Sequence, residues 1–161
     1  SQVNVTGLHY TNLSAVVQKA DVGGYHVFGL APAKIQTRVE QLPFVRRARV
    51  TILPASVLRI RVEERQPRFV WQGAEQSLWV DAEGVLLPAL AAAHLSLPVL
   101  VDDKGALVAP VAKEEQKRLR PEYAKRVALL FAQDPALRVL SYRVPEGFSF
   151  RWKGRTTVYF G

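Results

Sequence analysis

A strict alternation of apolar and charged residues between positions 57 and 64 constrains this chain more than any other feature of its sequence. Leu58, Ile60 and Val62 recur at every second position, and Arg59 and Arg61 occupy the positions between them. Successive side chains of a β-strand point to opposite faces of the sheet, so this period of two predicts a strand with one buried and one solvated face. A solvated sheet face that carries charge favours a surface that contacts a partner over a catalytic pocket.

The residues before this strand predict a small domain with helices on one face of a sheet. We expect strands at residues 3–6, 46–53 and 57–64. Between the first two lie a helix that follows an N-cap at Thr11 or Asn12 and a second helix that Pro32 opens. Helices confined to one face leave the opposite face of the sheet wet, in agreement with the charged positions of the alternating strand. The predicted order is therefore strand, helix, helix, strand, strand.

Beyond Pro67 the pattern changes to short strands separated by turns. We expect these strands at residues 68–72, 77–81, 84–87, 98–101, 137–144, 148–152 and 155–160. A helical stretch is predicted from residue 112 to residue 133, interrupted or restarted at Pro121. The chain is thus predicted to be α+β, with one domain at residues 1–66 and a larger, mostly antiparallel β domain with helices at residues 67–161.

The chain is basic and contains no cysteine. Its 22 lysines and arginines outnumber its 14 acidic residues, so the net charge is +8 and partners of negative potential are favoured. The excess is spread evenly along the chain, whereas a nucleic-acid reader more often concentrates it on one helix or stripe. The absence of cysteine excludes disulfides, thiolate catalysis and cysteine-based metal sites.

No pattern of residues predicts catalysis, a cofactor or a bound metal. The histidines His9, His26 and His94 are isolated in the sequence and lack the spacing of a zinc site. Asp81 and Asp102 fall at strand ends, where turn formation explains them. The usual nucleophile and phosphate-binding motifs are also missing, so we predict that the chain is not an enzyme.

The junction between the two predicted domains contains ionisable residues. Glu64 and Arg65 directly precede the proline that begins the second domain. An ion pair there, formed by Arg65 or across the junction, would fix the relative orientation of the domains. It would have the modest strength of a surface ion pair unless it is buried.

Several short stretches of this chain carry a recognisable pattern. They are, in chain order, Val5-Thr6-Gly7, Leu42-Pro43-Phe44-Val45, Ala48-Arg49-Val50, Leu58-x-Ile60-x-Val62-x-Glu64-Arg65-x-Pro67, Trp71, Leu78-x-Val80-Asp81-x-x-Gly84-Val85 and Leu97-Pro98-Val99-Leu100. In their order and spacing these stretches resemble the FtsQ/DivIB family of bacterial cell-division proteins. Residues 149–161 resemble the late strand pair of the family. The likeness is strong over the first hundred residues and weaker between residues 102 and 145.

The resemblance implies a fold, a place in the cell and a role. It implies a POTRA domain at residues 1–66 and an FtsQ-type β domain at residues 67–161. It also implies a membrane helix upstream of Ser1, with this chain on the extracytoplasmic side of the cell (inner) membrane. The implied role is a non-enzymatic scaffold at the septum that joins FtsB, FtsL and other division proteins, and nucleic acid is not among the implied partners.

The resemblance assigns no partner-contacting residue to this sequence. Members of the family commonly continue past the late strand pair with a helix and a strand that engage FtsB by strand addition, and this sequence holds no match to them. We therefore place a hypothetical partner site at the edge of the terminal strand, at Thr156, Val158, Tyr159 and Phe160. Arg59 and Arg61 on the charged sheet face complete the predicted set.

Three other interpretations remain open at this point. A POTRA-bearing outer-membrane assembly or chaperone module would bind unfolded strands at its sheet edge, but such proteins typically repeat the POTRA unit. A basic nucleic-acid-binding domain would bind DNA or RNA with a strong salt dependence. A cell-wall hydrolase that uses Asp81 or Asp102 ranks last, because no catalytic pair is evident.

Overall fold

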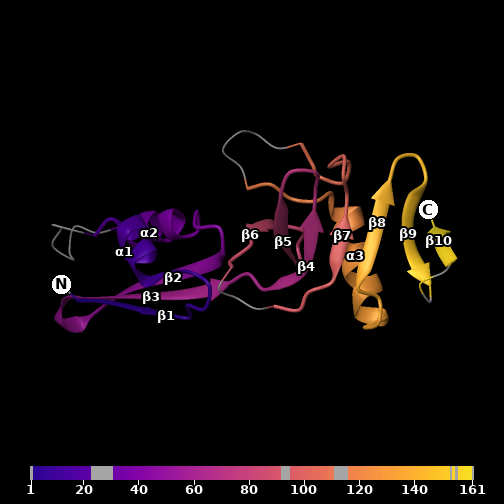
Figure 1. Ribbon diagram of the computed structural model, residues 1–161. Coiled ribbons are helices and arrows are strands. Elements are labelled where there is room, and N and C mark those ends of the chain that lie inside the picture. Colours follow the sequence, from indigo (N-terminus) through magenta and orange to yellow (C-terminus); the bar gives the residue numbers. More distant parts are fainter. Residues whose placement is uncertain are drawn as a thin grey trace. The chain divides into compact units, whose positions relative to one another are not determined.

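The computed structural model describes residues 2–22, 31–91, 95–110, 116–152, 154 and 156–160. The chain divides into two compact units, Ser1–Arg65 and Gln66–Gly161 (Figure 1). Each unit has its own sheet and its own cluster of buried side chains. Both units combine helices with a mixed sheet, so the predicted α+β class is confirmed.

The first unit has the predicted order of elements. Its strands are β1 (Gln2–Thr6), β2 (Val45–Leu53) and β3 (Val57–Glu64), and its helices are α1 (Leu13–Ala20) and α2 (Pro32–Val39). The sheet order is β1-β3-β2, with β1 parallel and β2 antiparallel to the central strand β3. A 3₁₀ turn, Pro54–Ser56, joins β2 to β3.

Local sequence signals fix where the two helices of this unit begin. The side chain of Asn12 accepts the backbone N–H of Ser14 at 2.8 Å and so caps α1. Pro32 stands in the first turn of α2, where its missing N–H leaves no hydrogen bond unmade. Both helices lie on one side of the sheet (Figure 1). Their buried residues join those of the sheet in one core, which contains Val16, Ala20, Ile35, Val39, Val45, Ala48, Leu58, Ile60 and Val62.

The second unit is built on a seven-stranded sheet with one described helix. Its elements are β4 (Pro67–Gln72), β5 (Ser77–Asp81), β6 (Leu86–Pro88), β7 (Val99–Val101), α3 (Pro121–Gln133), β8 (Val139–Arg143), β9 (Gly147–Trp152) and β10 (Thr156–Phe160). The sheet order is β10-β9-β8-β7-β4-β5-β6. Among the described strands, parallel pairing occurs between β4 and β7 and between β7 and β8, and the other pairs are antiparallel.

The helix α3 packs its apolar stripe onto one face of this sheet. Its residues Ala124, Val127 and Phe131 are buried. The rings of Phe131 and Phe69 lie 5.7 Å apart, and those of Tyr123 and Phe148 lie 5.9 Å apart. The apolar stripe of α3 thus faces this sheet, and the opposite face of β8, β9 and β10 is not covered by α3.

The predicted restart of this helix at Pro121 is confirmed, because α3 begins there. The prediction is wrong for residues 116–120, which are not helical, and residues 111–115 lie outside the described part. Leu119 is fully buried, and its N–H donates to the carbonyl of Gly84 at 2.8 Å. A residue that precedes proline is disfavoured in the α region, and Arg120 is accordingly extended, with ψ at 129°. Residues 116–120 therefore pair with the backbone of distant residues and do not form a helix.

Candidate partner-binding surfaces

The buried carboxylates that a hydrolase would need are occupied by structural hydrogen bonds. The Oδ1 atom of Asp81 accepts the backbone N–H groups of Glu83 and Val85 at 2.9 and 2.8 Å, which closes the turn after β5. The Oδ2 atom of Asp102 accepts the indole N–H of Trp71 at 3.1 Å. The same carboxylate also accepts the backbone N–H groups of the loop at residues 106–107. Both side chains thus shape loops, as their positions at strand ends predict.

Glu64 holds a loop of its own unit. Its Oε2 atom accepts the backbone N–H groups of His9 and Tyr10, and its Oε1 atom accepts that of Thr11, each at 2.7 Å. The side chain is buried and, within the described residues, forms no ion pair. Glu64 therefore stabilises the loop after β1, whereas the ion pair of Arg65 or across the junction stays a prediction. The alternation in the sequence already indicated that Glu64 is buried, because position 64 follows 58, 60 and 62 on the buried face of β3.

The predicted residues of the terminal strand lie together at one edge of the larger sheet. β10 pairs with β9 in antiparallel register from Thr156 opposite Trp152 to Phe160 opposite Phe148. In the part of the chain that the structure describes, no strand pairs with its outer side. Val158 is 37% exposed and Tyr159 is 61% exposed. We call this strand, Thr156–Phe160, the β10 edge.

The β10 edge lacks the devices that usually protect a sheet edge. Its five residues include no charged residue and no proline, and its register with β9 has no bulge. The opposite edge strand, β6, ends in Pro88, and the N–H of Leu86 donates to the carbonyl of Lys117 at 2.9 Å. One edge of the sheet is thus covered by the chain itself, while the other presents a strand rich in residues that favour β-structure.

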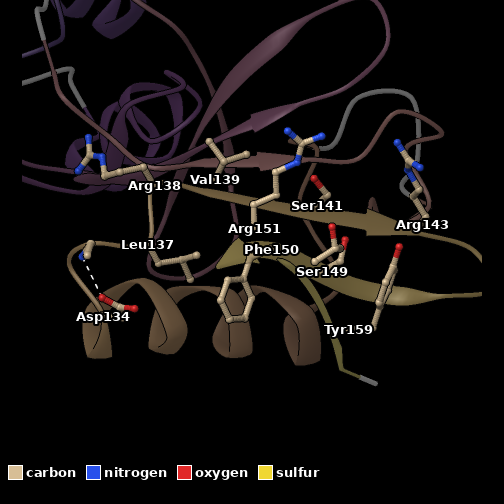
Figure 2. A pocket seen from close by; sticks show the side chains of 12 residues that line it. Asp134, Leu137, Arg138, Val139, Ser141, Arg143, Ser149, Phe150, Arg151 and Tyr159 are labelled. Carbon is tan, nitrogen blue, oxygen red and sulfur yellow. Dashed lines mark hydrogen bonds between the residues drawn. The ribbon is translucent and has the colours of Figure 1, made fainter. Parts of the chain in front are cut away.

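A groove of about 860 Å³ lies over the face of β8, β9 and β10 that points away from α3 (Figure 2). Phe150 points toward the helix, while Arg151 points to the other side of the sheet. Ser149 stands opposite both Ser141 and Tyr159 in the strand register, and Arg151 stands opposite Thr157. The groove therefore has a floor of hydroxyl groups that continues to the β10 edge.

The charge of this groove is positive. Arg138, Arg143 and Arg151 line it, together with one carboxylate, Asp134, which accepts the N–H of Ala136 at 2.9 Å. Arg138 in turn donates to the carbonyl and hydroxyl oxygens of Ser96 at 2.9 and 2.8 Å. A segment with acidic or hydrogen-bonding side chains fits such a lining.

A smaller cavity of about 190 Å³ lies beside Asp102, Tyr142 and Arg143. The hydrogen bond with Tyr123, followed by desolvation, raises the pKa of Tyr142 above its ordinary value, so this phenol is protonated at neutral pH. A protonated phenol offers no activated base or nucleophile. We therefore assign no chemistry to this cavity.

Arg59 and Arg61 lie on the face of β3 that points away from the helices. Both are exposed, and the intervening residues Leu58, Ile60 and Val62 are buried, so the predicted alternation is confirmed. These two arginines belong to the first unit, whereas the four predicted residues of β10 belong to the second. The predicted site residues thus form two separate sets.

Sequence reasoning missed two arginines of the same face. Arg47 and Arg49 on β2 are exposed, and Arg49 stands directly opposite Arg61. The signal was present, because Arg47 and Arg49 alternate with buried or half-buried residues and a short turn joins the two strands. Antiparallel pairing across that turn places these side chains beside Arg59 and Arg61.

Neither a metal centre nor a membrane-spanning helix occurs in the described residues. No group of three or more metal-binding side chains lies together there. His9 is described, whereas His26 and His94 lie outside the described residues. Each described helix is too short or too polar to cross a bilayer.

Comparison with known proteins gives relatives for both units. A family model described as "POTRA domain, FtsQ-type" matches residues 1–65. The cell division protein FtsQ of Rhodothermus marinus is 34% identical over 128 residues, which cover 77% of this chain and 45% of the relative. The cell division protein FtsQ of Chloroflexus aggregans is 26% identical over 150 residues, which cover 92% of this chain and 50% of the relative. The chain thus spans about half the length of these curated relatives.

Proposed function

Because this chain belongs to the FtsQ/DivIB family of bacterial cell-division proteins, we propose that it is a non-enzymatic scaffold of the division machinery. It links early and late division proteins at the septum through protein–protein contacts. The carboxylates of Glu64, Asp81 and Asp102 hold loops in place, which supports a scaffold over an enzyme.

The observation that carries this proposal is the β10 edge. An extended partner segment adds to such an edge through main-chain hydrogen bonds, and its alternate side chains give specificity. On one face the added strand lies beside Tyr159, where the groove reaches the edge of the sheet. On the other face it meets Val158 and Phe160. The partner strand therefore alternates acidic or polar residues with apolar ones.

The partners in this proposal are the outward-facing segments of FtsB and FtsL. The chain is held at the cell (inner) membrane by a single helix upstream of residue 1 and lies on the extracytoplasmic side. The assembly-module and nucleic-acid alternatives are not favoured, because both curated relatives are cell-division proteins.

Calorimetric titration of the chain with FtsB and FtsL segments from the same organism tests the proposal. Saturable binding that survives high salt is expected, because main-chain hydrogen bonds carry it. Heat that appears only at low salt, or no heat at all, contradicts a partner site within this chain. A C-terminally extended chain that also fails to bind contradicts the scaffold role itself.

Proline substitutions locate the site on β10. In an edge strand, every second residue points its N–H to the paired strand, and the residues between point theirs to the outer side. Of the variants Val158→Pro and Tyr159→Pro, one therefore removes an N–H that points outward. The variant that loses the outward N–H is expected to fold and to lose partner binding. Val158→Thr keeps the N–H and a β-branched side chain, and it serves as the matched control that retains binding. Equal binding by all three variants places the partner elsewhere.

A further inference from the structure

Four arginines gather on the outer face of the first unit's sheet, away from α1 and α2. The strand register arranges the outer face in rows across β1, β3 and β2. One row is Asn4, Arg59 and Thr51, and the next is Thr6, Arg61 and Arg49. Arg47 follows in a third row, opposite Glu63. We call Arg47, Arg49, Arg59 and Arg61 the arginine face.

These four guanidinium groups are not neutralised by the chain as described. All four are exposed, and within the described residues none of them forms an ion pair or a hydrogen bond. Glu63, the acid of this face, is engaged by Arg46 at 2.8 Å. Like charges directly opposite each other, as in the pair Arg49 and Arg61, destabilise a sheet. A bound anion would relieve this repulsion.

The arginine face has the residue composition that suits a flat surface carrying phosphate groups. The cations of this sheet are all arginines, whereas lysines occur on the helices at Lys19 and Lys34. A guanidinium matches phosphate through two parallel hydrogen bonds, which an ammonium does not. Strands of a sheet lie about 4.8 Å apart, so the arginines form a closely spaced, nearly flat array.

The same face lacks the features of a protein or nucleic-acid interface. Protein interfaces are centred on apolar and aromatic anchors, but the outward residues of β1 are Gln2, Asn4 and Thr6. The described outward positions include two apolar residues, Val57 and Leu53. Both are half-buried, and they lie opposite each other in the row at one end of this sheet face. Single-stranded nucleic acid calls for aromatic stacking platforms, and the described outer positions include no aromatic residue.

We propose that the arginine face binds the anionic headgroups of a phospholipid bilayer. This inference rests on the proposed function in one respect, because it uses the membrane helix that the proposed function places before β1. Gln2 pairs with Val57 in parallel register, so a helix that precedes β1 joins the sheet beside the turn between β2 and β3. A tether at this point keeps the face at a high effective concentration near the bilayer, where a modest affinity suffices.

Vesicle co-sedimentation of the whole chain tests this inference without any division protein. The vesicles contain phosphatidylcholine alone or phosphatidylcholine with phosphatidylglycerol, and binding is measured at low and at raised salt. The chain is expected to bind only the vesicles with phosphatidylglycerol and to release them as salt screens the charges. Equal binding to both kinds of vesicle overturns the proposal.

Two triple variants with the same loss of charge separate the arginine face from net charge. Arg49→Gln, Arg59→Gln and Arg61→Gln together weaken partitioning about 100-fold, since each basic residue near a bilayer contributes about a factor of five. Arg68→Gln, Lys125→Gln and Arg126→Gln remove three exposed charges from the second unit and leave binding within about twofold. Circular dichroism confirms that both variants are folded. Equal losses in the two variants overturn the proposal.

The outcomes distinguish this inference from the proposed function. The arginine-face variant is expected to bind the FtsB and FtsL segments as the unaltered chain does, because those contacts belong to β10. If duplex DNA binds through the arginine face while vesicles do not, the face is a nucleic-acid site and the lipid proposal is wrong. Vesicle binding that persists when the division partners fail to bind leaves the lipid proposal standing alone.

Discussion

The carboxylate of Glu64 accepts the backbone N–H of His9 at 2.7 Å across 55 residues of chain. The same carboxylate binds the next two N–H groups of the loop, so the end of β3 and the loop after β1 are joined by charge-assisted hydrogen bonds. Tyr10 in that loop also stacks on Phe44 with ring centroids 5.3 Å apart. Glu64 thus closes the first unit on itself.

Replacing this carboxylate is expected to destabilise the first unit. Glu64→Gln removes the charge and leaves one carbonyl for three N–H groups, so we expect a loss of about 3 kcal/mol in the free energy of unfolding. Glu63→Gln, on the exposed face of the same strand, is the control and is expected to change stability by about 0.5 kcal/mol or less. Denaturant unfolding measures both. Similar small effects in the two variants would show that the loop does not depend on Glu64.

Gly84 is expected to tolerate no side chain. Its φ is +79°, and an added Cβ would lie 2.8 Å from the Cβ of Ala124. Gly154→Ala is a matched control, because its φ of +70° has the same backbone strain but no atom lies within 4 Å of the added Cβ. We expect a loss of about 1 kcal/mol for Gly154→Ala and about 3 kcal/mol for Gly84→Ala. Equal midpoints in thermal unfolding would contradict the close approach of α3 to this turn.

Reversing one charge in the arginine face is expected to stabilise the chain. Arg49→Glu places an acid opposite Arg61, and such cross-strand pairs contribute about 0.5 kcal/mol. The unfolding midpoint is therefore expected to rise, and the rise should shrink as salt is added. Arg68→Glu changes the net charge equally in the second unit and serves as the control. A fall in the midpoint for Arg49→Glu would mean that the two side chains do not meet.

The elements of this fold that local patterns determine could be predicted from the sequence. The alternation in β3 and the caps at Asn12 and Pro32 are local signals, and the observed elements begin or run where these signals indicate. Residues 116–120 belong to a stretch with a helical pattern, but their backbone pairs with distant parts of the chain instead. Leu119 is buried and its N–H donates to the carbonyl of Gly84, and no local pattern in the sequence predicts such a contact.

The order of strands in the second unit could not be predicted for the same reason. The parallel pairing of β4 with β7 places Val70 beside Val99. This pairing is determined by the packing of the whole unit. This order decides which strand lies at the edge of the sheet. The groove beside Tyr159 likewise arises from the register of three strands, which no local pattern determines.

The pattern within single strands predicts only part of the arginine face. Arg59 and Arg61 follow from the period of two in one strand. Arg47 and Arg49 require the register between two strands, which the turn length sets. Predicting the hairpin together with its register would have placed all four arginines on one face.

Amide hydrogen exchange of β10 tests the central claim most directly. In the chain alone, alternate amides between Thr156 and Phe160 are expected to exchange fast, because their N–H groups point to the outer side of the sheet. Addition of the FtsB segment is predicted to slow those amides while the amides bonded to β9 stay protected as before. Protection that appears elsewhere, with the outward amides of β10 still exchanging fast, would contradict strand addition at this edge.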